Sequence, residues 1–228
     1  MPLARTDLNL APARLLIDRH EAHDAPFDVE VDGLTLTILP GVFCPTFTKT
    51  SPFLARHVRV PEGASVLDVF SGSGYQGLLT ARAGAASVVC VDQSVIATEC
   101  ATLNAARNGF NSVAKAMTGD VFGPVLGQRF DVVIANPPLL PGTPATSIEA
   151  AIFDPGLDHT VQFLGQVRDH LTRDGRAFLI STDAHRGMGL LDIESSAVPA
   201  GLAATAVAEL ALPYETYTVY ELSPRGSR

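Results

Sequence analysis

Residues 65–77 read SVLDVFSGSGYQG, and this stretch says most about the fold of the chain. Its first five residues form a short apolar run, and the glycines at 72, 74 and 77 match the pattern Gly-x-Gly-x-x-Gly. The residues that follow, 75–83, are predicted to form a helix. Between a strand and a helix, such a turn lets the backbone approach a ligand closely and points the helix N-terminus at it. The plain alternative is a turn that only packs the helix against the strand.

The same alternation of strands and helices continues along the chain. Further apolar runs are predicted as strands at 87–91, 113–117, 130–135 and 176–181, with helices at 94–108, 159–171 and 187–198. This alternation predicts a doubly wound α/β domain with a mostly parallel sheet covered on both faces. Residues 203–212 and 216–222 follow each other closely, so we expect them to form a final antiparallel hairpin.

Smaller elements are predicted before the glycine turn. Residues 10–22 have the pattern of a short helix, and Asp32-Gly33 between two alternating runs is a strong hairpin signal. Ser51-Pro52 is typical of an N-cap followed by the first helical residue, and we expect that helix to run to about His57.

Composition limits the class of protein. The 228 residues suffice for one α/β domain, and 46% hydrophobic with 18% charged residues is ordinary for a globular chain. The net charge of −8 argues against nucleic acid and against an anionic membrane as partners. The densest basic cluster, Arg56, His57 and Arg59, is interpreted as the solvated end of a helix.

The cysteines and possible metal ligands point to no special scaffold. Three cysteines at 44, 90 and 100, without a Cys-x-x-Cys pair, indicate neither a disulfide framework nor a zinc site. This usage fits a reducing, cytoplasmic setting, and the scattered His and carboxylate residues predict no metal. The sequence predicts neither a signal peptide nor a transmembrane helix, and it leaves the oligomeric state open.

Two acidic residues stand where strands next to the glycine turn end. Asp92 ends the second strand, 15 residues beyond Gly77, where a carboxylate can accept both ribose hydroxyl protons. It could also serve only as an acid at the start of the next helix. Asp120 follows Gly119 after the third strand and could accept from an adenine amino group, or be only a turn residue.

Two cofactors fit these residues, a dinucleotide and S-adenosylmethionine (SAM). Asp68 lies four residues before the first glycine of the turn. A buried acid there would repel a pyrophosphate but could interact with the ammonium of SAM. SAM is therefore favoured, although loop amides could equally satisfy the Asp68 carboxylate.

The fourth strand ends in Asn136-Pro137-Pro138-Leu139. Ligands bind outside the carboxyl ends of parallel strands, although Asn-Pro also ends strands for local reasons. The Asn136 side chain and the Pro137 carbonyl could both accept from one NH₂ group and aim its lone pair at an electrophile. Such orientation suits methyl transfer, because that reaction disperses a positive charge and needs no strong base.

With these motifs, the sequence resembles the class I SAM-dependent methyltransferases over residues 41–222. Residues 66–74 resemble their first motif, Val91-Asp92 the acidic second motif and Gly119-Asp120 the adenine-side motif. Asn136-Pro137-Pro138 is similar to the fourth motif of the amino-methylating branch, which includes HemK-like release-factor glutamine methyltransferases, small-domain ribosomal RNA methyltransferases and N6-adenine methyltransferases. Residues 40–50 resemble the segment that helps to cover SAM in HemK-like and small-domain enzymes.

The resemblance implies a seven-stranded Rossmann-like sheet in the order 3-2-1-4-5-7-6. It implies a helix-and-hairpin extension covering the cofactor (1–45), a methyltransferase domain (46–223) and a tail (224–228). It also implies SAM as the cofactor, a catalytic role for Asn136 and Pro137, and substrate contacts for Pro138 and Leu139. The cofactor contacts that it implies are Asp68, Phe70, Ser71, Gly72, Gly74, Asp92, Gln93, Asp120, Val121 and Asn136.

Two departures from the branch concern the methyl acceptor. An aromatic residue that stacks on a planar substrate usually follows Asn-Pro-Pro, whereas this chain has Leu139, so an aliphatic or guanidino-like amine gains weight. About 45 residues precede the cofactor-side loop, too few for the helical substrate domain of HemK-like enzymes. The acidic loop 153–159 either lines the substrate site or forms a turn with a helix cap.

We therefore expect a SAM-dependent methyltransferase that methylates an amine, amide or guanidino nitrogen. Its substrate would be a small molecule or a locally presented protein segment. One alternative is an O- or C-methyltransferase of small-molecule metabolism, which would need a base near the methyl group. The others are a nicotinamide-dependent dehydrogenase and a non-catalytic SAM-binding partner subunit.

Overall fold

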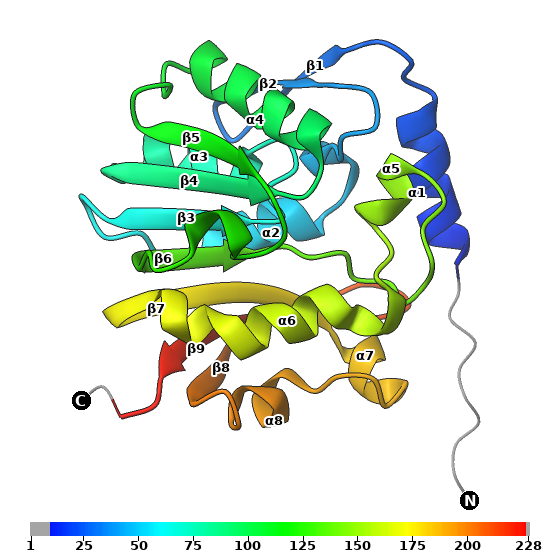
Figure 1. Cartoon of the computed structure of the whole chain (residues 1–228). Coiled ribbons are helices and arrows are strands. Elements are labelled where there is room, and N and C mark those ends of the chain that lie inside the picture. Colours follow the sequence, from blue (N-terminus) through cyan, green and yellow to red (C-terminus); the bar gives the residue numbers. More distant parts are fainter. Residues whose placement is uncertain (1–9, 227–228) are drawn as a thin grey trace, which may run out of the picture.

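The computed structural model describes residues 10–226 (Figure 1). The strands are β1 (Phe27–Val31), β2 (Leu34–Ile38), β3 (Ser65–Val69), β4 (Ser87–Asp92), β5 (Ala114–Thr118), β6 (Phe130–Ala135), β7 (Leu171–Thr182), β8 (Leu202–Ala211) and β9 (Thr216–Pro224). The α-helices are α1 (Ala11–Glu21), α2 (Thr50–His57), α3 (Tyr75–Arg82), α4 (Val95–Arg107), α5 (Ser147–Ala150), α6 (Asp158–Gln166), α7 (Asp183–Gly187) and α8 (Ile193–Ala197). Short 3₁₀ turns cover Pro45–Phe47, Gly123–Val125, Pro155–Leu157 and Val167–His170. Residues 1–9 of the predicted extension and 227–228 of the predicted tail lie outside the described part.

The central sheet has seven strands in the order β5-β4-β3-β6-β7-β9-β8. Pairing is parallel from β5 through β7, and β9 runs antiparallel to both β7 and β8. Counted within this sheet alone, the order is 3-2-1-4-5-7-6. The expected doubly wound Rossmann-like architecture and the final antiparallel hairpin are thereby confirmed.

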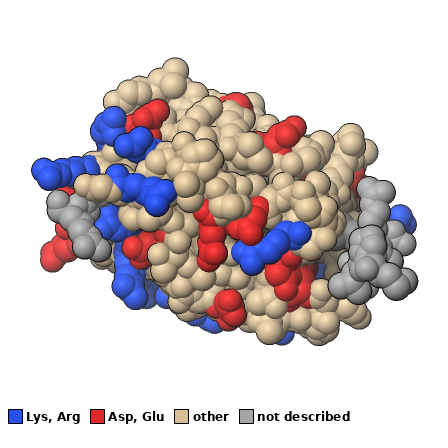
Figure 2. Space-filling view, turned by 90° about the horizontal axis from the view of Figure 1, so that it is seen from below, with Lys and Arg blue, Asp and Glu red and all other residues tan. Residues whose placement is uncertain are grey.

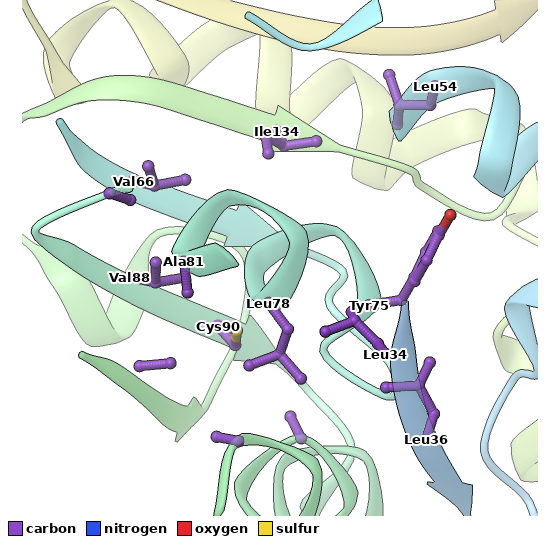
Figure 3. Packing of buried hydrophobic residues seen from close by; sticks show 14 of the residues in the cluster. Leu34, Leu36, Leu54, Val66, Tyr75, Leu78, Ala81, Val88, Cys90 and Ile134 are labelled. Atoms are coloured by element: carbon purple, nitrogen blue, oxygen red, sulfur yellow. The ribbon is translucent and has the colours of Figure 1, made fainter. Parts of the chain in front are cut away.

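Helices cover both faces of the sheet (Figure 1), as parallel strands require. One large apolar cluster joins α2, α3 and α4 to one face, and a second joins α6 and α8 to the other. Figure 3 shows Leu54 of α2 and Leu78 of α3 with Ile134 of β6 in the first cluster. Gly77 makes this packing close, because a Cβ there would lie 2.8 Å from the Cys90 sulfur of β4. The glycine turn therefore sits on a tightly packed base.

The N-terminal hairpin forms as its Asp-Gly signal predicts. Asp32 and Gly33 both have positive φ, at 47° and 73°, which a two-residue hairpin turn of the primed type requires. The hairpin lies against α4, where Asn104 Oδ1 accepts from the Thr37 backbone N–H at 2.7 Å. It therefore buttresses the helix that follows β4.

Ser51 does not have its predicted role as a helix N-cap. Helix α2 already begins at Thr50, and Lys49 at the cap position makes no capping bond with its side chain. The Ser51 hydroxyl instead accepts a hydrogen bond from the side chain of Asn136. The Ser51 hydroxyl, which the local pattern predicted as a cap of the helix, thus bonds a distant side chain instead.

Two other boundaries also differ from the predictions. The single helix expected over 187–198 is two short helices, α7 and α8, and Gly189 between them has a φ of 69° that ends the first. The helix predicted over 159–171 ends earlier, at Gln166, and Leu171 is the first residue of β7. Residues 172–175 bulge out of register opposite Asp131, whose carboxylate accepts from Thr172 Oγ1 at 3.0 Å. Hydrogen bonds to the neighbouring strand thus extend β7 through a turn-like sequence.

Candidate functional site

A cavity opens at the carboxyl ends of β3, β4 and β6, with a volume of about 1180 Å³ when the space at its mouth is included. Its floor, here called the cavity floor, consists of the glycine turn (70–76), the end of β4 (92–94) and the loop after β6 (136–139). The opposite wall, here called the cover, consists of α1, the loop 41–45 and residues 147–152. Other wall residues are Thr48, Thr50, Ser51, Ala97, Leu140 and Tyr217.

Asp92 holds the glycine turn in shape. Its Oδ2 accepts from the Gly72 backbone N–H at 2.9 Å, and its Oδ1 accepts from the Ser94 N–H at 2.9 Å. Burial raises the pKa of this carboxyl, and the two backbone N–H groups oppose that rise. The carboxylate also lies on the cavity wall, so one group both fixes the turn and faces the space beside it.

Asp68 lies beneath the turn and is not part of the cavity wall. Its side chain is 1% exposed, and its Oδ2 accepts from the Gly77 backbone N–H at 2.8 Å. Burial raises its pKa to about 7, and the nearby Asp92 carboxylate adds to the rise. Within the described residues, Asp68 Oδ1 and the hydroxyl of Ser71 are buried without a hydrogen-bond partner. Ser71 is a residue of the wall, so a buried polar atom without a partner lies at the edge of the cavity.

Asn136 lies at the other end of the floor, directly after β6. Its Nδ2 donates to Ser51 Oγ at 3.1 Å. Gln76, in the first turn of α3, donates from Nε2 to the Ser51 carbonyl at 2.8 Å. Among residues 10–226, neither Asn136 Oδ1 nor the Pro137 carbonyl accepts any hydrogen bond. Two acceptors are therefore available on adjacent residues of the cavity wall.

The residues after Asn136 are held from behind by a buried histidine. His185 Nε2 donates to the Leu139 carbonyl at 2.6 Å, and its Nδ1 accepts from Ser181 Oγ at 3.0 Å. Burial lowers the pKa of His185, which keeps the imidazole neutral and able to fill both roles. His185 thus fixes the loop that carries Pro138 and Leu139, although it is not on the wall itself.

The cover is held by apolar packing, ring contacts and hydrogen bonds of a buried histidine. A small apolar cluster joins α1 to α5, and its buried members are Ala13, Ile17, Ile148 and Ile152. His20 Nδ1 donates to the Leu16 carbonyl at 2.7 Å, and its Nε2 accepts from the Cys44 N–H at 2.9 Å, which ties α1 to the loop 41–45. Leu16 itself lies on the cavity wall.

The predicted site residues fall into two groups. Those on the cavity wall are Phe70, Ser71, Gly72, Asp92, Gln93, Asn136, Pro137, Pro138 and Leu139. Those off the wall are Asp68, Gly74, Asp120 and Val121. Asp120 is exposed and its carboxylate accepts from Gln162 Nε2 at 2.8 Å, while Val121 is buried in the second core cluster. The structure therefore does not bring Asp120 and Val121 to the wall, and a role for them at the adenine ring stays a prediction.

The acidic loop 153–159 acts as a structural cap. Asp154 is fully buried and accepts from both the backbone N–H and Nδ1 of His159, at 2.9 and 2.8 Å. This bond raises the pKa of His159. No residue of the loop lies on the described cavity wall, so of the two interpretations the structure favours the turn and helix cap.

Several wall residues were not predicted from the sequence. Ser51 and Gln76 are buried polar residues of α2 and α3, and Tyr217 comes from β9. A buried glutamine inside the glycine pattern is a signal that sequence reading could have used, whereas nothing local marks Ser51 or Tyr217. The Tyr217 hydroxyl donates to Glu215 Oε1 at 2.5 Å. Across residues 10–226 no cluster of His, Cys, Asp and Glu is placed to hold a metal ion.

Comparison with known proteins found matches among methyltransferases. The family described as "Methyltransferase small domain" matches residues 33–192. A candidate protein N5-glutamine methyltransferase of Methanocaldococcus jannaschii is 26% identical over 84% of this chain and 96% of its own length. The release factor glutamine methyltransferase of Geobacter sulfurreducens is 34% identical over 49% of this chain, which spans only 39% of that relative.

A solved structure places the fold among methyltransferases. A candidate methyltransferase complexed with SAH, the product that SAM leaves after methyl transfer, aligns with a TM-score of 0.61 at 14% identity. The alignment covers 87% of this chain and 56% of the other. Within the described part of the chain, no helix combines the length and apolar character needed to cross a membrane.

Proposed function

The chain belongs to the methyltransferase small-domain family and is a SAM-dependent methyltransferase of HemK-like type, and from this premise we propose that it methylates a side-chain amide nitrogen of a protein. The observation that carries the proposal is the pair of free acceptors at Asn136 Oδ1 and the Pro137 carbonyl. An NH₂ group that donates to both is fixed in plane, with its lone pair directed out of that plane. The chemical step then depends on orientation more than on a base.

The charge of the cavity favours an uncharged acceptor. Asp92 is the one charged side chain among the described wall residues. A guanidinium or ammonium acceptor would need a counter-charge near Asn136, because an unpaired buried charge is costly. A neutral amide needs only hydrogen-bond acceptors. The proposed acceptor is therefore an amide and not a guanidino-like amine, and the name of the Methanocaldococcus jannaschii relative supports the same choice.

The floor also fits the cofactor. When bound, SAM supplies a methyl group on a positively charged sulfur. We assign its ribose hydroxyls to Asp92 and its amino-acid end to the turn at Phe70 to Gly72, where the unpaired Ser71 hydroxyl and the buried Asp68 carboxylate lie. Those orphaned polar atoms fit a group rich in hydrogen-bond donors and positive charge. Gln93 would contact the nucleoside from the end of β4.

In the described part of the N-terminal extension (residues 10–45), helix α1 and the hairpin β1–β2 would have different roles. Helix α1 would cover the bound cofactor through Leu16, which lies on the cavity wall. The hairpin β1–β2 contributes no described wall residue and would support α4 instead. The expectation that residues 1–45 cover the cofactor as a whole is thus narrowed to α1 and the loop 41–45.

Transfer of a radiolabelled methyl group from SAM tests this function. The purified chain is offered protein, RNA and small-metabolite fractions of an extract from cells that lack its gene. We expect label in the protein fraction, with wild-type rates from the control Asn111→Ala and little label from Asn136→Ala. Label confined to RNA or to metabolites would contradict the protein substrate. SAM binding without label in any fraction would favour a non-catalytic partner subunit.

A further inference from the structure

A second residue, Ser51, touches the side chain on which the proposed chemistry depends. Ser51 is 2% exposed, lies in the first turn of α2 and comes 85 positions before Asn136 in the chain. Its hydroxyl accepts from Asn136 Nδ2, which is the only hydrogen bond that the Asn136 side chain makes within the described residues. An asparagine amide can turn by half a rotation, which exchanges its donor and acceptor ends. With Nδ2 held by Ser51, Oδ1 is left as the end of the amide that has no partner.

Ser51 is itself anchored to the cofactor side of the cavity. Its carbonyl accepts from Gln76 Nε2 at 2.8 Å, and Gln76 is 5% exposed in the helix that follows the glycine turn. Gly77, the next residue, is bonded to the buried carboxylate of Asp68 at 2.8 Å. A continuous set of contacts therefore links the glycine turn, through α2, to Asn136.

We propose that Ser51 is a positioning residue for methyl transfer, which sets the Asn136 amide so that Oδ1 serves as the acceptor for the substrate NH₂ group. The proposal rests on the proposed function, because it assumes that Asn136 orients the methyl acceptor. Removing the Ser51 hydroxyl leaves Nδ2 free to turn towards the cavity. There, the Nδ2 hydrogens would face the substrate N–H, and two donors cannot bond each other. The orientation of Asn136 that accepts from the substrate would then be only one of several that the side chain adopts.

Kinetics separate this role from a structural one. Ser51→Ala is expected to lower kcat by about 5- to 30-fold, as the loss of one orienting hydrogen bond implies, with SAM affinity within about twofold of wild type. The matched control is Thr80→Val, which removes another buried hydroxyl from the neighbouring helix α3. We expect this control to keep kcat and the SAM affinity, although it loses a similar hydrogen bond.

A double-mutant cycle tests whether Ser51 acts through Asn136. In an Asn136→Ala background, adding Ser51→Ala is expected to cause no further loss of transfer. If the two losses instead multiply, Ser51 acts independently of Asn136 and the proposal is overturned.

A second readout needs no methyl acceptor. The side-chain NH₂ signals of Asn136 are identified in an NMR spectrum of the SAH-bound protein by their absence from Asn136→Ala. In Ser51→Ala we expect these signals to shift and to exchange faster with water, whereas in Thr80→Val they stay in place. Unchanged signals in Ser51→Ala would refute the positioning role. If no extract fraction accepts methyl label, the proposed function fails, while this spectrum still shows whether Ser51 holds the Asn136 amide in place.

Discussion

The floor and the cover of the cavity are built in different ways. The floor is formed by strand ends of the central sheet, and the carboxylates of the buried Asp68 and the half-buried Asp92 accept from its backbone N–H groups. In the cover, four buried apolar residues join α1 to α5, His20 bonds α1 to the loop 41–45, and Val42 and Cys44 of that loop belong to the large core cluster. Groups that need exact placement therefore lie on hydrogen-bonded strand ends, whereas α1 and α5 of the cover are held to each other mainly by side-chain packing.

Replacing Asn136 on the floor is expected to have the largest effect on methyl transfer. Asn136→Ala is expected to lower kcat by about 10²- to 10³-fold, because one preorganised hydrogen-bonding group is removed from the reacting centre. The SAM affinity should stay within a few-fold of wild type. Single-turnover kinetics and calorimetry measure the two quantities, with Asn111→Ala, an exposed asparagine, as control. An equal loss of SAM affinity would place Asn136 with the cofactor instead of the acceptor.

Asp92 and Asp120 follow adjacent strands, and replacing each in turn tests which of them contacts SAM. Asp92→Ala is expected to weaken SAM binding by roughly 10- to 100-fold, the effect of losing hydrogen bonds to a charged group. Asp120→Ala is expected to weaken it by less than about threefold, because Asp120 is exposed and off the cavity wall. Calorimetric titration with SAM measures both. Equal losses would mean that the cavity reorganises to bring Asp120 onto the cofactor.

Asp68, beneath the cavity floor, makes the free energy of unfolding depend on pH. Its pKa is about 7 in the folded chain and 3.8 in its ordinary state, so between these values the unfolded chain loses the proton first. The contribution of Asp68 to the free energy of unfolding is therefore full below pH 3.8 and falls as pH rises towards 7.

Asp68→Asn should remove the contribution of Asp68 to the pH dependence of the free energy of unfolding. The asparagine keeps an acceptor for the Gly77 N–H. Urea denaturation at several pH values between about 4 and 8 measures it, with wild type alongside. We expect the mutant to gain stability relative to wild type as pH rises through this range. Parallel pH profiles for the two proteins would show that Asp68 ionises normally.

The smallest effect is expected at the cover. Ile17→Ala removes an 8% exposed side chain from the cluster between α1 and α5 and should cost about 2 kcal/mol of local packing, the low end for such a change. We expect SAM to dissociate a few-fold faster with kcat little changed, measured by stopped-flow mixing and turnover. A matched control is Val161→Ala, an exposed residue of α6 away from the cavity. A large fall in kcat would show that the cover helps to align the reacting groups.

The floor could be predicted from the sequence, whereas the cover could be predicted only in part: α1 and the loop 41–45 were expected, but α5 and its contact with α1 were not. Asp92 and Asn136 each follow an apolar run directly, and parallel strands bring such positions to one edge of a sheet. The contact between α1 and α5 joins segments about 130 residues apart with no motif in either. Ser51 illustrates the same limit, because its local pattern predicts an N-cap and a partner 85 residues away takes its hydroxyl. Local rules fail where a distant side chain competes for the same atom.

If the cavity floor holds an amide nitrogen in place for methylation, the methylated product is an N-methyl amide. Labelled protein from the transfer experiment is hydrolysed in acid and then made alkaline. An N-methyl amide breaks at its C–N bond and releases labelled methylamine, which is volatile. We predict volatile label in methylamine with the wild-type chain and almost none with Asn136→Ala. Label recovered as methanol, or left on a non-volatile amino acid, would mean that the acceptor is an oxygen, a carbon or an amine, and would contradict this account.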